Sequence, residues 1–377
     1  MGRLPLLIAF LAAGTVAADW STLDRFQQTI TRAEFDRLLF TVYSPDRAIT
    51  NYLTYTANSV TIDGQFELRF ATNAPGQSAT RPARPRIVLD PGHIGGEWAR
   101  MEERFFVRGH DRPVQEAILN LTVARLLKAR LESAGFTVLL SKDNFEPVTL
   151  KRPEDFRAEA ERLIPDFAAY PEHERTAARA DALRKRMELL FYRNAEITAR
   201  AEHINQDLAP DLTLCLHFNA VEWNERQDLV EDNRLLIFVH GNYLPSEVAD
   251  DQQRLRLFQK LLAGTIDREL PVAEAVVDAL AKATGLPPVQ YGPKSGAIRV
   301  GPNPYVYARN LAANRLINGP VIFLEPYYMN NRIVYQRIQL GDYDGTKEIE
   351  GRPYPSIFRE YADAVAAGLI SVFPRAP

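Results

Sequence analysis

The feature that most constrains the fold is the alternation of short apolar segments with amphipathic helical segments. Beyond residue 83, apolar strands are expected at 86–90, 136–140, 212–216, 235–239 and 321–324. Helical spacing separates several of them: apolar residues recur three or four apart from Glu116 to Ala134, and Gly135 ends that run. Further helices are expected at 194–207 and at about 354–373. This alternation predicts an α/β domain with a mostly parallel, twisted sheet flanked by helices.

Two long helical stretches interrupt the alternation, near residues 153–190 and 244–286. Both are interpreted as insertions into one domain that spans residues 83–377. A solvated helical bundle is the favoured interpretation of each insertion. The alternative is a lid over the active site, because long insertions in enzymes often cover functional sites.

Residues 19–82 are expected to form a small N-terminal α+β module followed by a linker. Residues 23–39 have helical spacing, and residues 59–70 read as a hairpin with Asp63-Gly64 as its turn. Residues 73–85 are rich in proline, alanine and small polar residues, as linkers are. The module has no recognisable chemistry, so binding, docking and simple packing all stay open.

The first 18 residues have the layout of a secretory signal peptide. Arg3 precedes an apolar run from Leu4 to Ala13, and small residues at 16–18 precede a plausible cleavage point. A buried N-terminal helix is the less favoured alternative, because it would alternate polar and apolar faces. The chain is therefore expected to be exported to the periplasm or the cell exterior. No later segment is apolar enough to span a membrane.

Charge and cysteine content argue against a nucleic-acid-binding protein and against a disulfide-stabilised one. The formal net charge is −3, so no basic excess is present to bind nucleic acid. Cys215 is the single cysteine, so the chain has no internal disulfide. It lies in an apolar run and is expected to be buried and inert.

Four polar residues lie where such a fold builds its sites. His93, His217 and Glu325 each follow an apolar strand, and Glu116 opens the helix after the first strand. Strand ends and the following helix starts meet at one edge of a parallel sheet, so these side chains should converge. Two imidazoles and one carboxylate form a zinc set that leaves a position open for water. As the third ligand, Glu97, Glu102 and Glu103 compete nearly evenly with Glu116.

The other histidines are expected to be packing or surface residues: His110, His173, His203 and His240. The sequence contains no HExxH pattern, which excludes the metalloprotease arrangement carried on one helix.

The same segments resemble the Amidase_3 family of zinc-dependent N-acetylmuramoyl-L-alanine amidases, which hydrolyse peptidoglycan. Its four motifs read here, in order, as Asp90-Pro91-Gly92-His93-Ile94-Gly95-Gly96, then Glu116 with Asn120-Leu121, then Cys215-Leu216-His217-Phe218-Asn219-Ala220, and Pro320-Val321-Ile322-Phe323-Leu324-Glu325. The resemblance covers about residues 84–373 apart from the two insertions. It implies His93, Glu116 and His217 as zinc ligands and Glu325 as the catalytic residue.

The chain departs from the family pattern at three places. Ile94 replaces a usual glycine, Cys215 replaces a usual serine, and Pro326-Tyr327-Tyr328 follows the glutamate where a glycine-aromatic pair is common. These departures concern the shape of the substrate groove and leave the metal set unchanged.

The resemblance implies zinc-assisted hydrolysis of the amide bond between N-acetylmuramic acid and L-alanine. Asn219 and Arg309 are candidate substrate contacts, and peptidoglycan is the expected partner. An activator protein is expected if either insertion covers the zinc. The alternatives are a zinc carboxypeptidase or peptidase, and a cell-wall-binding protein without catalysis.

Overall fold

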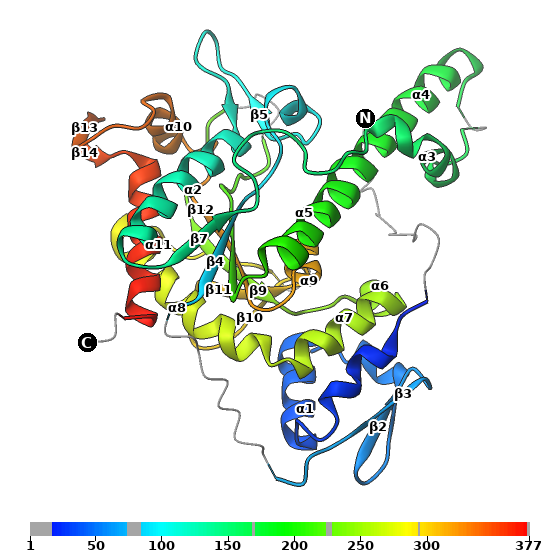
Figure 1. The fold of residues 1–377 in the computed structure, drawn as a ribbon. Coiled ribbons are helices and arrows are strands. Elements are labelled where there is room, and N and C mark those ends of the chain that lie inside the picture. The colour runs from blue at the N-terminus through cyan, green and yellow to red at the C-terminus, as the bar shows by residue number, and fades with distance from the viewer. Residues whose placement is uncertain (1–16, 74–83, 168–169, 224–227, 293–294, 375–377) are drawn as a thin grey trace.

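The computed structural model describes residues 17–73, 84–167, 170–223, 228–292 and 295–374 (Figure 1). Residues 1–16 of the expected signal peptide and residues 74–83 of the expected linker lie outside this range. Over the described residues, the structure contains no helix with the length and apolar character needed to cross a bilayer.

The centre of the molecule is a seven-stranded mixed sheet. Its spatial order is β10 (Ile298–Arg299), β11 (Val306–Arg309), β9 (Leu235–His240), β12 (Val321–Pro326), β8 (Leu212–Leu216), β4 (Arg86–Pro91) and β7 (Thr137–Leu140). Neighbouring strands are parallel except at β9–β12 and β10–β11. This confirms the expected α/β class with a mostly parallel sheet. The antiparallel pairings were not predicted, because an apolar run carries no information on strand direction.

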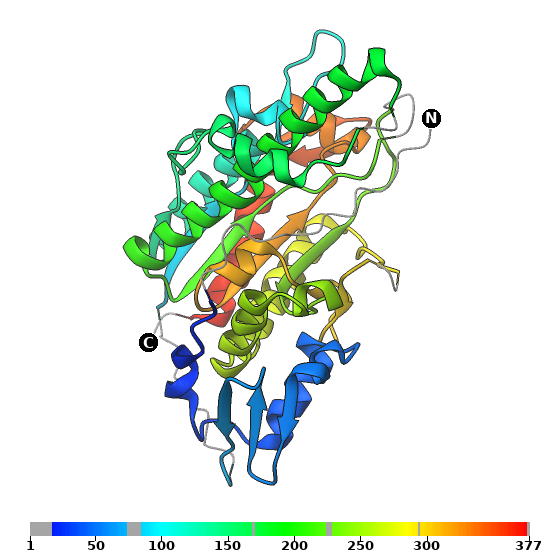
Figure 2. The same cartoon turned by 90° about the vertical axis from the view of Figure 1, so that its right-hand side faces the viewer.

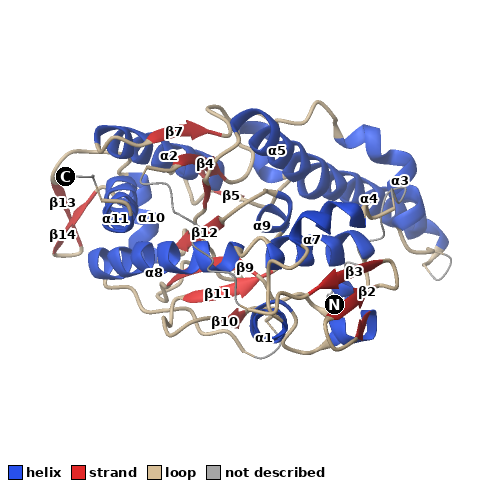
Figure 3. Ribbon diagram, turned by 60° about the horizontal axis from the view of Figure 1, so that its bottom comes forward, coloured by secondary structure: helices blue, strands red, loops and turns tan. Residues whose placement is uncertain are grey.

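Helices cover both faces of the sheet (Figures 1 and 3). One face packs against α2 (Glu116–Ser133), α8 (Thr265–Thr284) and α11 (Ile357–Val372), and the other against α5 (Ile197–His203) and α9 (Ala312–Leu316). Within β4, Ile87 and Leu89 join the first of these cores, whereas Val88 joins the second. The middle of the strand, Ile87 to Leu89, is a continuous apolar run because it is buried on both faces.

The N-terminal module contains a three-stranded antiparallel sheet, β1 (Leu53–Tyr55), β2 (Ser59–Ile62) and β3 (Phe66–Arg69). This confirms the expected α+β character, including the hairpin. The continuous helix expected at 23–39 is wrong: a 3₁₀ helix at Trp20–Phe26 is followed by α1 at Arg32–Leu38. The break occurs because Gln28 has a left-handed φ of 58° and the Thr31 side chain caps α1.

The two helical stretches differ in their surroundings. Residues 153–190 contain α3 (Arg157–Leu163) and α4 (Glu172–Leu189), which extend away from the sheet (Figure 1). Residues 244–286 contain α6 (Pro245–Val248), α7 (Asp251–Leu262) and α8. The second stretch differs from the expected solvated bundle, because Val272, Val276 and Leu280 of α8 are fully buried beneath the sheet.

Short elements complete the described chain: β5 (Phe105–Phe106), β6 (Val114–Gln115), α10 (Arg332–Gln339), β13 (Thr346–Ile349) and β14 (Arg352–Pro355). The last helix begins at Ile357, later than the expected start near 354, because Tyr354 and Pro355 pair in β14.

Candidate metal centre and catalytic cleft

The loop after β4 holds His93 in an unusual backbone conformation. His93 has a φ of 66°, in the left-handed region. The Asn120 side-chain amide of α2 donates a 3.1 Å hydrogen bond to the Gly92 carbonyl, and the Lys142 ammonium donates to the His93 carbonyl. A Cβ atom at Gly92 would lie 2.0 Å from the His217 ring, so only glycine fits there. Two strands that are far apart in sequence thus bring their histidines together.

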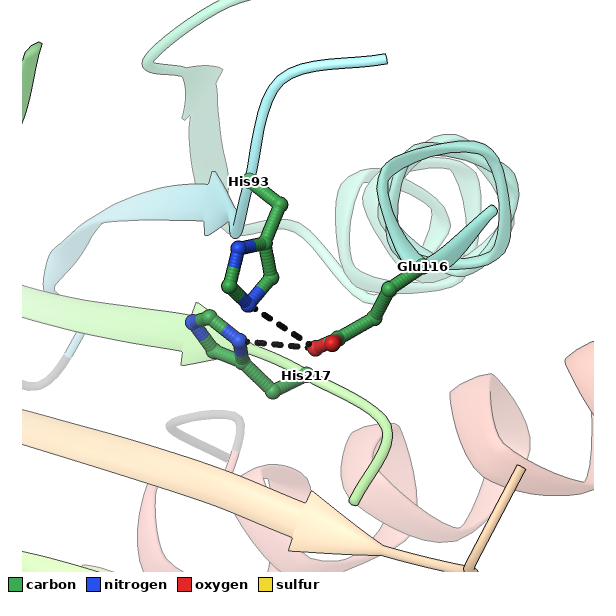
Figure 4. A group of neighbouring side chains, drawn as sticks. All are labelled: His93, Glu116 and His217. Atoms are coloured by element: carbon green, nitrogen blue, oxygen red, sulfur yellow. Dashed lines mark hydrogen bonds and ion pairs between the residues drawn. The ribbon is translucent and has the colours of Figure 1, made fainter. Parts of the chain in front are cut away.

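His93, Glu116 and His217 converge from three elements (Figure 4). Glu116 Oε1 lies 3.3 Å from His93 Nε2 and 3.0 Å from His217 Nδ1. One ligand atom from each residue lies within 4.8 Å of the others. Phe323 of β12 stacks on the His217 ring, with centroids 4.1 Å apart, and so fixes its plane. Two imidazoles and a carboxylate in this arrangement form a donor set suited to a zinc ion.

Glu102 lies behind the first histidine and holds its orientation. Its Oε2 atom lies 3.0 Å from His93 Nδ1 and accepts a second 3.0 Å bond from the Ile94 amide. A ring whose Nδ1 proton is donated to Glu102 presents the Nε2 lone pair to the centre. The sequence had put Glu102 forward as a competing ligand, whereas the structure places it as a support. Glu97 and Glu103 are exposed.

Arg104 is a second support that sequence reasoning missed. Its Nε atom lies 3.1 Å from Glu116 Oε2, so it holds the carboxylate oxygen that does not face both rings. The backbone amide of Glu116 also donates to the Arg104 carbonyl at 3.2 Å. No local sequence signal marks this pair, because the pairing of β5 with β6 brings the two residues together.

The charges of the cluster act on one another. Burial alone would lower the pKa of His93, but the negative charges of Glu116 and Glu102 outweigh it and raise this pKa to about 9. Burial lowers the pKa of His217 to about 4, which keeps its ring neutral. Burial opposes ionisation of Glu116, but the two histidines hold its pKa far below the usual range. Glu116 and His217 are thus in the ionised and neutral forms that bind metal, whereas His93 must lose a proton before its Nε2 atom can bind.

The cluster opens into a cleft of about 420 Å³ that also contains Glu325 and Arg309. Glu325 lies near the end of β12, and burial together with the charge of Glu116 raises its pKa to about 7, against the opposing charges of Arg104, His93 and Arg309. A carboxyl group with such a pKa can exchange protons near neutral pH. Asn219 is not among the residues that line this cleft, and its side-chain oxygen accepts from the Ala220 amide.

A model of the family Amidase_3, N-acetylmuramoyl-L-alanine amidase, matches residues 87–349. The chain belongs to this family. The matched range contains all four polar residues that the sequence placed at the sheet edge. Family membership supports N-acetylmuramoyl-L-alanine amidase activity on peptidoglycan, which is a hydrolytic reaction.

Solved structures of similar proteins include several amidases. The apo form of Ami1 from Mycobacterium abscessus is 16% identical, with a TM-score of 0.39 over 76% of this chain and 96% of that one. Ami1 from Mycobacterium smegmatis is 15% identical, with a TM-score of 0.40 over 76% and 95%. The CwlD amidase from Clostridioides difficile, solved in complex with the GerS lipoprotein, is 14% identical, with a TM-score of 0.40 over 76% and 96%. No curated protein sequence matches the chain.

Proposed function

We propose that this protein is a zinc-dependent amidase that cleaves the bond between N-acetylmuramic acid and L-alanine in peptidoglycan. The observation that carries the proposal is the meeting of His93, Glu116 and His217 in a cleft that also contains Glu325. The donor set fits zinc by its chemistry, and Glu102 and Arg104 already hold two of its members in place.

In the proposed mechanism, a bound zinc ion would supply a Lewis acid that polarises the scissile carbonyl and acidifies a water molecule. Glu325 accepts a proton from the attacking water and then donates it to the leaving amine nitrogen. Arg309, whose guanidinium lies 5.8 Å from the Phe238 ring centroid, offers donors to substrate oxygens from the same cleft. Asn219 stays a candidate substrate contact, although it does not line the cleft.

Export to the periplasm or cell exterior forms part of the proposal, because peptidoglycan lies outside the cytoplasm. The predicted signal peptide supports it. Expression of the full chain in a bacterium, followed by fractionation and N-terminal sequencing, tests this: an exported product should begin near Asp19.

Control by an activator protein also stays a proposal. The stretch that follows α4 supplies Tyr192 and Arg193 to the cleft, so α4 would restrict access through this stretch rather than by direct contact. Leu183→Ala should loosen the packing of α4 and raise the rate on cell-wall sacculi. An unchanged rate in a folded variant would speak against a lid.

Metal analysis of the purified protein, together with digestion of purified sacculi, tests the function. We expect about one zinc per chain, release of stem peptides with a free L-alanine amino group, and loss of this release with a chelator. Release of a C-terminal amino acid instead would indicate a carboxypeptidase. Zinc and sacculus binding without released peptide would indicate a cell-wall-binding protein.

A further inference from the structure

A second cleft lies between the N-terminal module and the catalytic domain, away from the metal centre. It has a volume of about 690 Å³. The module contributes Thr22 and Arg25, α7 contributes Arg256 and Lys260, and α9 contributes Arg315. Figure 2 shows the N-terminal residues packed beneath these helices.

The charged side chains that line this cleft are almost all cationic. Asp24 is the one acidic residue among the described lining residues, and it is exposed. The cations donate to neutral acceptors: Arg256 to the Gln259 side chain at 3.0 Å, and Arg315 to the Asn310 side chain at 2.8 Å. In the part of the chain that the structure describes, neither guanidinium forms a salt bridge with a carboxylate.

Lys260 is buried at the bottom of the same cleft. Its ammonium donates to the carbonyls of Ile317 at 2.6 Å and Gly319 at 2.8 Å, which leaves one N–H unused in these bonds. The opposing charge that acts most strongly on Lys260 is that of Glu269 on α8, whose two oxygens also accept backbone N–H bonds, from His240 and Val321. Glu269 offsets part of the positive charge of Lys260, whereas burial and the neighbouring cations Arg256 and Arg268 act against that charge.

The electrostatic consequence is mutual repulsion among the cations. Burial, and then the charge of Arg315, lower the pKa of Arg256 although Tyr243 opposes them. Burial lowers the pKa of Lys260, with Arg256 and Arg268 acting in the same direction against Glu269. Arg256 and Arg315 are half-buried and form no salt bridge within the described residues, which is costly, and a bound anion would offset that cost.

We propose that this cleft is a binding site for a phosphate-class oxyanion, either free or carried on a larger ligand, held by Arg256, Arg315 and Lys260. Guanidinium groups match the planar oxygen pairs of phosphate, and an ammonium adds a point charge. The cleft has room for more than the phosphoryl group itself. The N-terminal module lines the same cleft with Thr22 and Arg25, so a ligand larger than the phosphoryl group would also meet the module.

Titration of the zinc-loaded full chain with inorganic phosphate, by calorimetry at constant ionic strength, tests the proposal. We expect saturable binding that weakens at least tenfold in Arg256→Gln and in Arg315→Gln. The matched control is Arg179→Gln, which removes one positive charge from an exposed position on α4 and should leave the Kd within twofold. Equal affinity in all of these variants, or no saturable binding to the unmodified chain, would overturn the proposal.

Two further measurements identify the source of the anion and test whether phosphate binds at the metal centre instead. Glycerol 3-phosphate distinguishes the sources of the anion: tighter binding than inorganic phosphate indicates a phosphorylated ligand, and weaker binding a free ion. Phosphate that binds instead at the metal centre would be unaffected by Arg256→Gln, which also overturns the proposal. If a glutamine variant loses its fold by circular dichroism, Arg256→Lys, which keeps the charge but loses the planar fork, should weaken binding severalfold; unchanged affinity would refute the assignment.

Discussion

At the scale of single residues, the proposed metal centre depends on side chains that are not among its proposed ligands. Glu102 accepts from His93 Nδ1 and from the Ile94 backbone amide, so one carboxylate oxygen holds both the ring and its loop. His93 needs this support because its backbone lies in the left-handed region, which residues other than glycine seldom occupy. We therefore expect Glu102 to orient His93 for metal binding.

Glu102→Ala should weaken zinc binding by about 10–100-fold, as is typical when such a support is removed. Competition with a chromophoric chelator measures the affinity directly and independently of activity. Glu97→Ala is the matched control, since Glu97 is exposed on the same loop and should leave the affinity unchanged. Equal losses in both variants would mean that the net charge of the loop, and not the hydrogen bond to His93, sets the affinity.

Glu325 gives a second residue-scale prediction, on pH dependence. Its pKa is raised to about 7, and it must be ionised to accept a proton, so amidase activity should fall as the pH drops below that value. A bound cation favours the ionised form, so in the zinc-loaded enzyme this acid limb should lie at or below pH 7.

Glu325→Gln should lower kcat by about 10²–10⁴-fold at unchanged zinc content.

Zinc content measured at each pH separates the titration of Glu325 from loss of the metal by protonation of its histidines. Full turnover in Glu325→Gln, with the metal still bound, would refute its assignment as the proton carrier.

At the scale of elements, α8 and α11 cross so closely that position 368 of α11 has room only for glycine. A Cβ atom at Gly368 would lie 2.6 Å from Val276 Cα and 2.8 Å from the Ala275 carbonyl oxygen. These are backbone atoms, which cannot turn aside as a side chain can. The two helices together cover one face of the sheet, so their separation influences the packing of the strands that carry the site.

Gly368→Ala should destabilise the protein although alanine favours helix. The gain in helix propensity is roughly 0.5–1 kcal/mol, whereas overpacking costs typically about 1–3 kcal/mol and more against backbone. A lower midpoint in urea unfolding would show this. Gly292→Ala is the control, because a Cβ atom there meets nothing within 4 Å. A midpoint for Gly368→Ala at or above that of the unmodified chain would show that the helices can separate at little cost.

At the scale of the whole molecule, the N-terminal module shares its core with the catalytic domain. Phe258 of α7 stacks on Phe35 of α1 with centroids 6.0 Å apart, and Arg254 of α7 forms a salt bridge with Asp63. The backbone amides of Asn242 and Tyr243 donate to the carbonyls of Val42 and Tyr43. A contact of this kind couples the folding of the two parts.

Phe258→Ala should lower the free energy of unfolding by about 3–5 kcal/mol, the usual cost of removing a buried phenylalanine. Unfolding should stay a single transition by calorimetry, because the two parts share one core. Leu150→Ala is the control, since Leu150 is 95% exposed and should have almost no effect. Two separate transitions, with only the first one shifted, would mean that the module folds on its own.

The sequence by itself determined the α/β class and identified the polar residues at the carboxyl edge of the parallel strands. Apolar periodicity is a local property, and so is the position of His93, His217 and Glu325 after strands and of Glu116 at a helix start. The convergence of these residues follows because strand ends and helix starts of parallel units meet at one edge.

Only the tertiary structure decided matters that depend on distant contacts. It set the antiparallel direction of β9 relative to β12 and the burial of α8. It also decided that Glu116 joins the two histidines, whereas Glu102 contacts the far side of the His93 ring. It also assembled the cationic cleft from the N-terminal module, α7 and α9. The sequence could not predict these features. An apolar run does not reveal which strand it will pair with, and a charged residue does not reveal which other charges will lie near it in the folded chain.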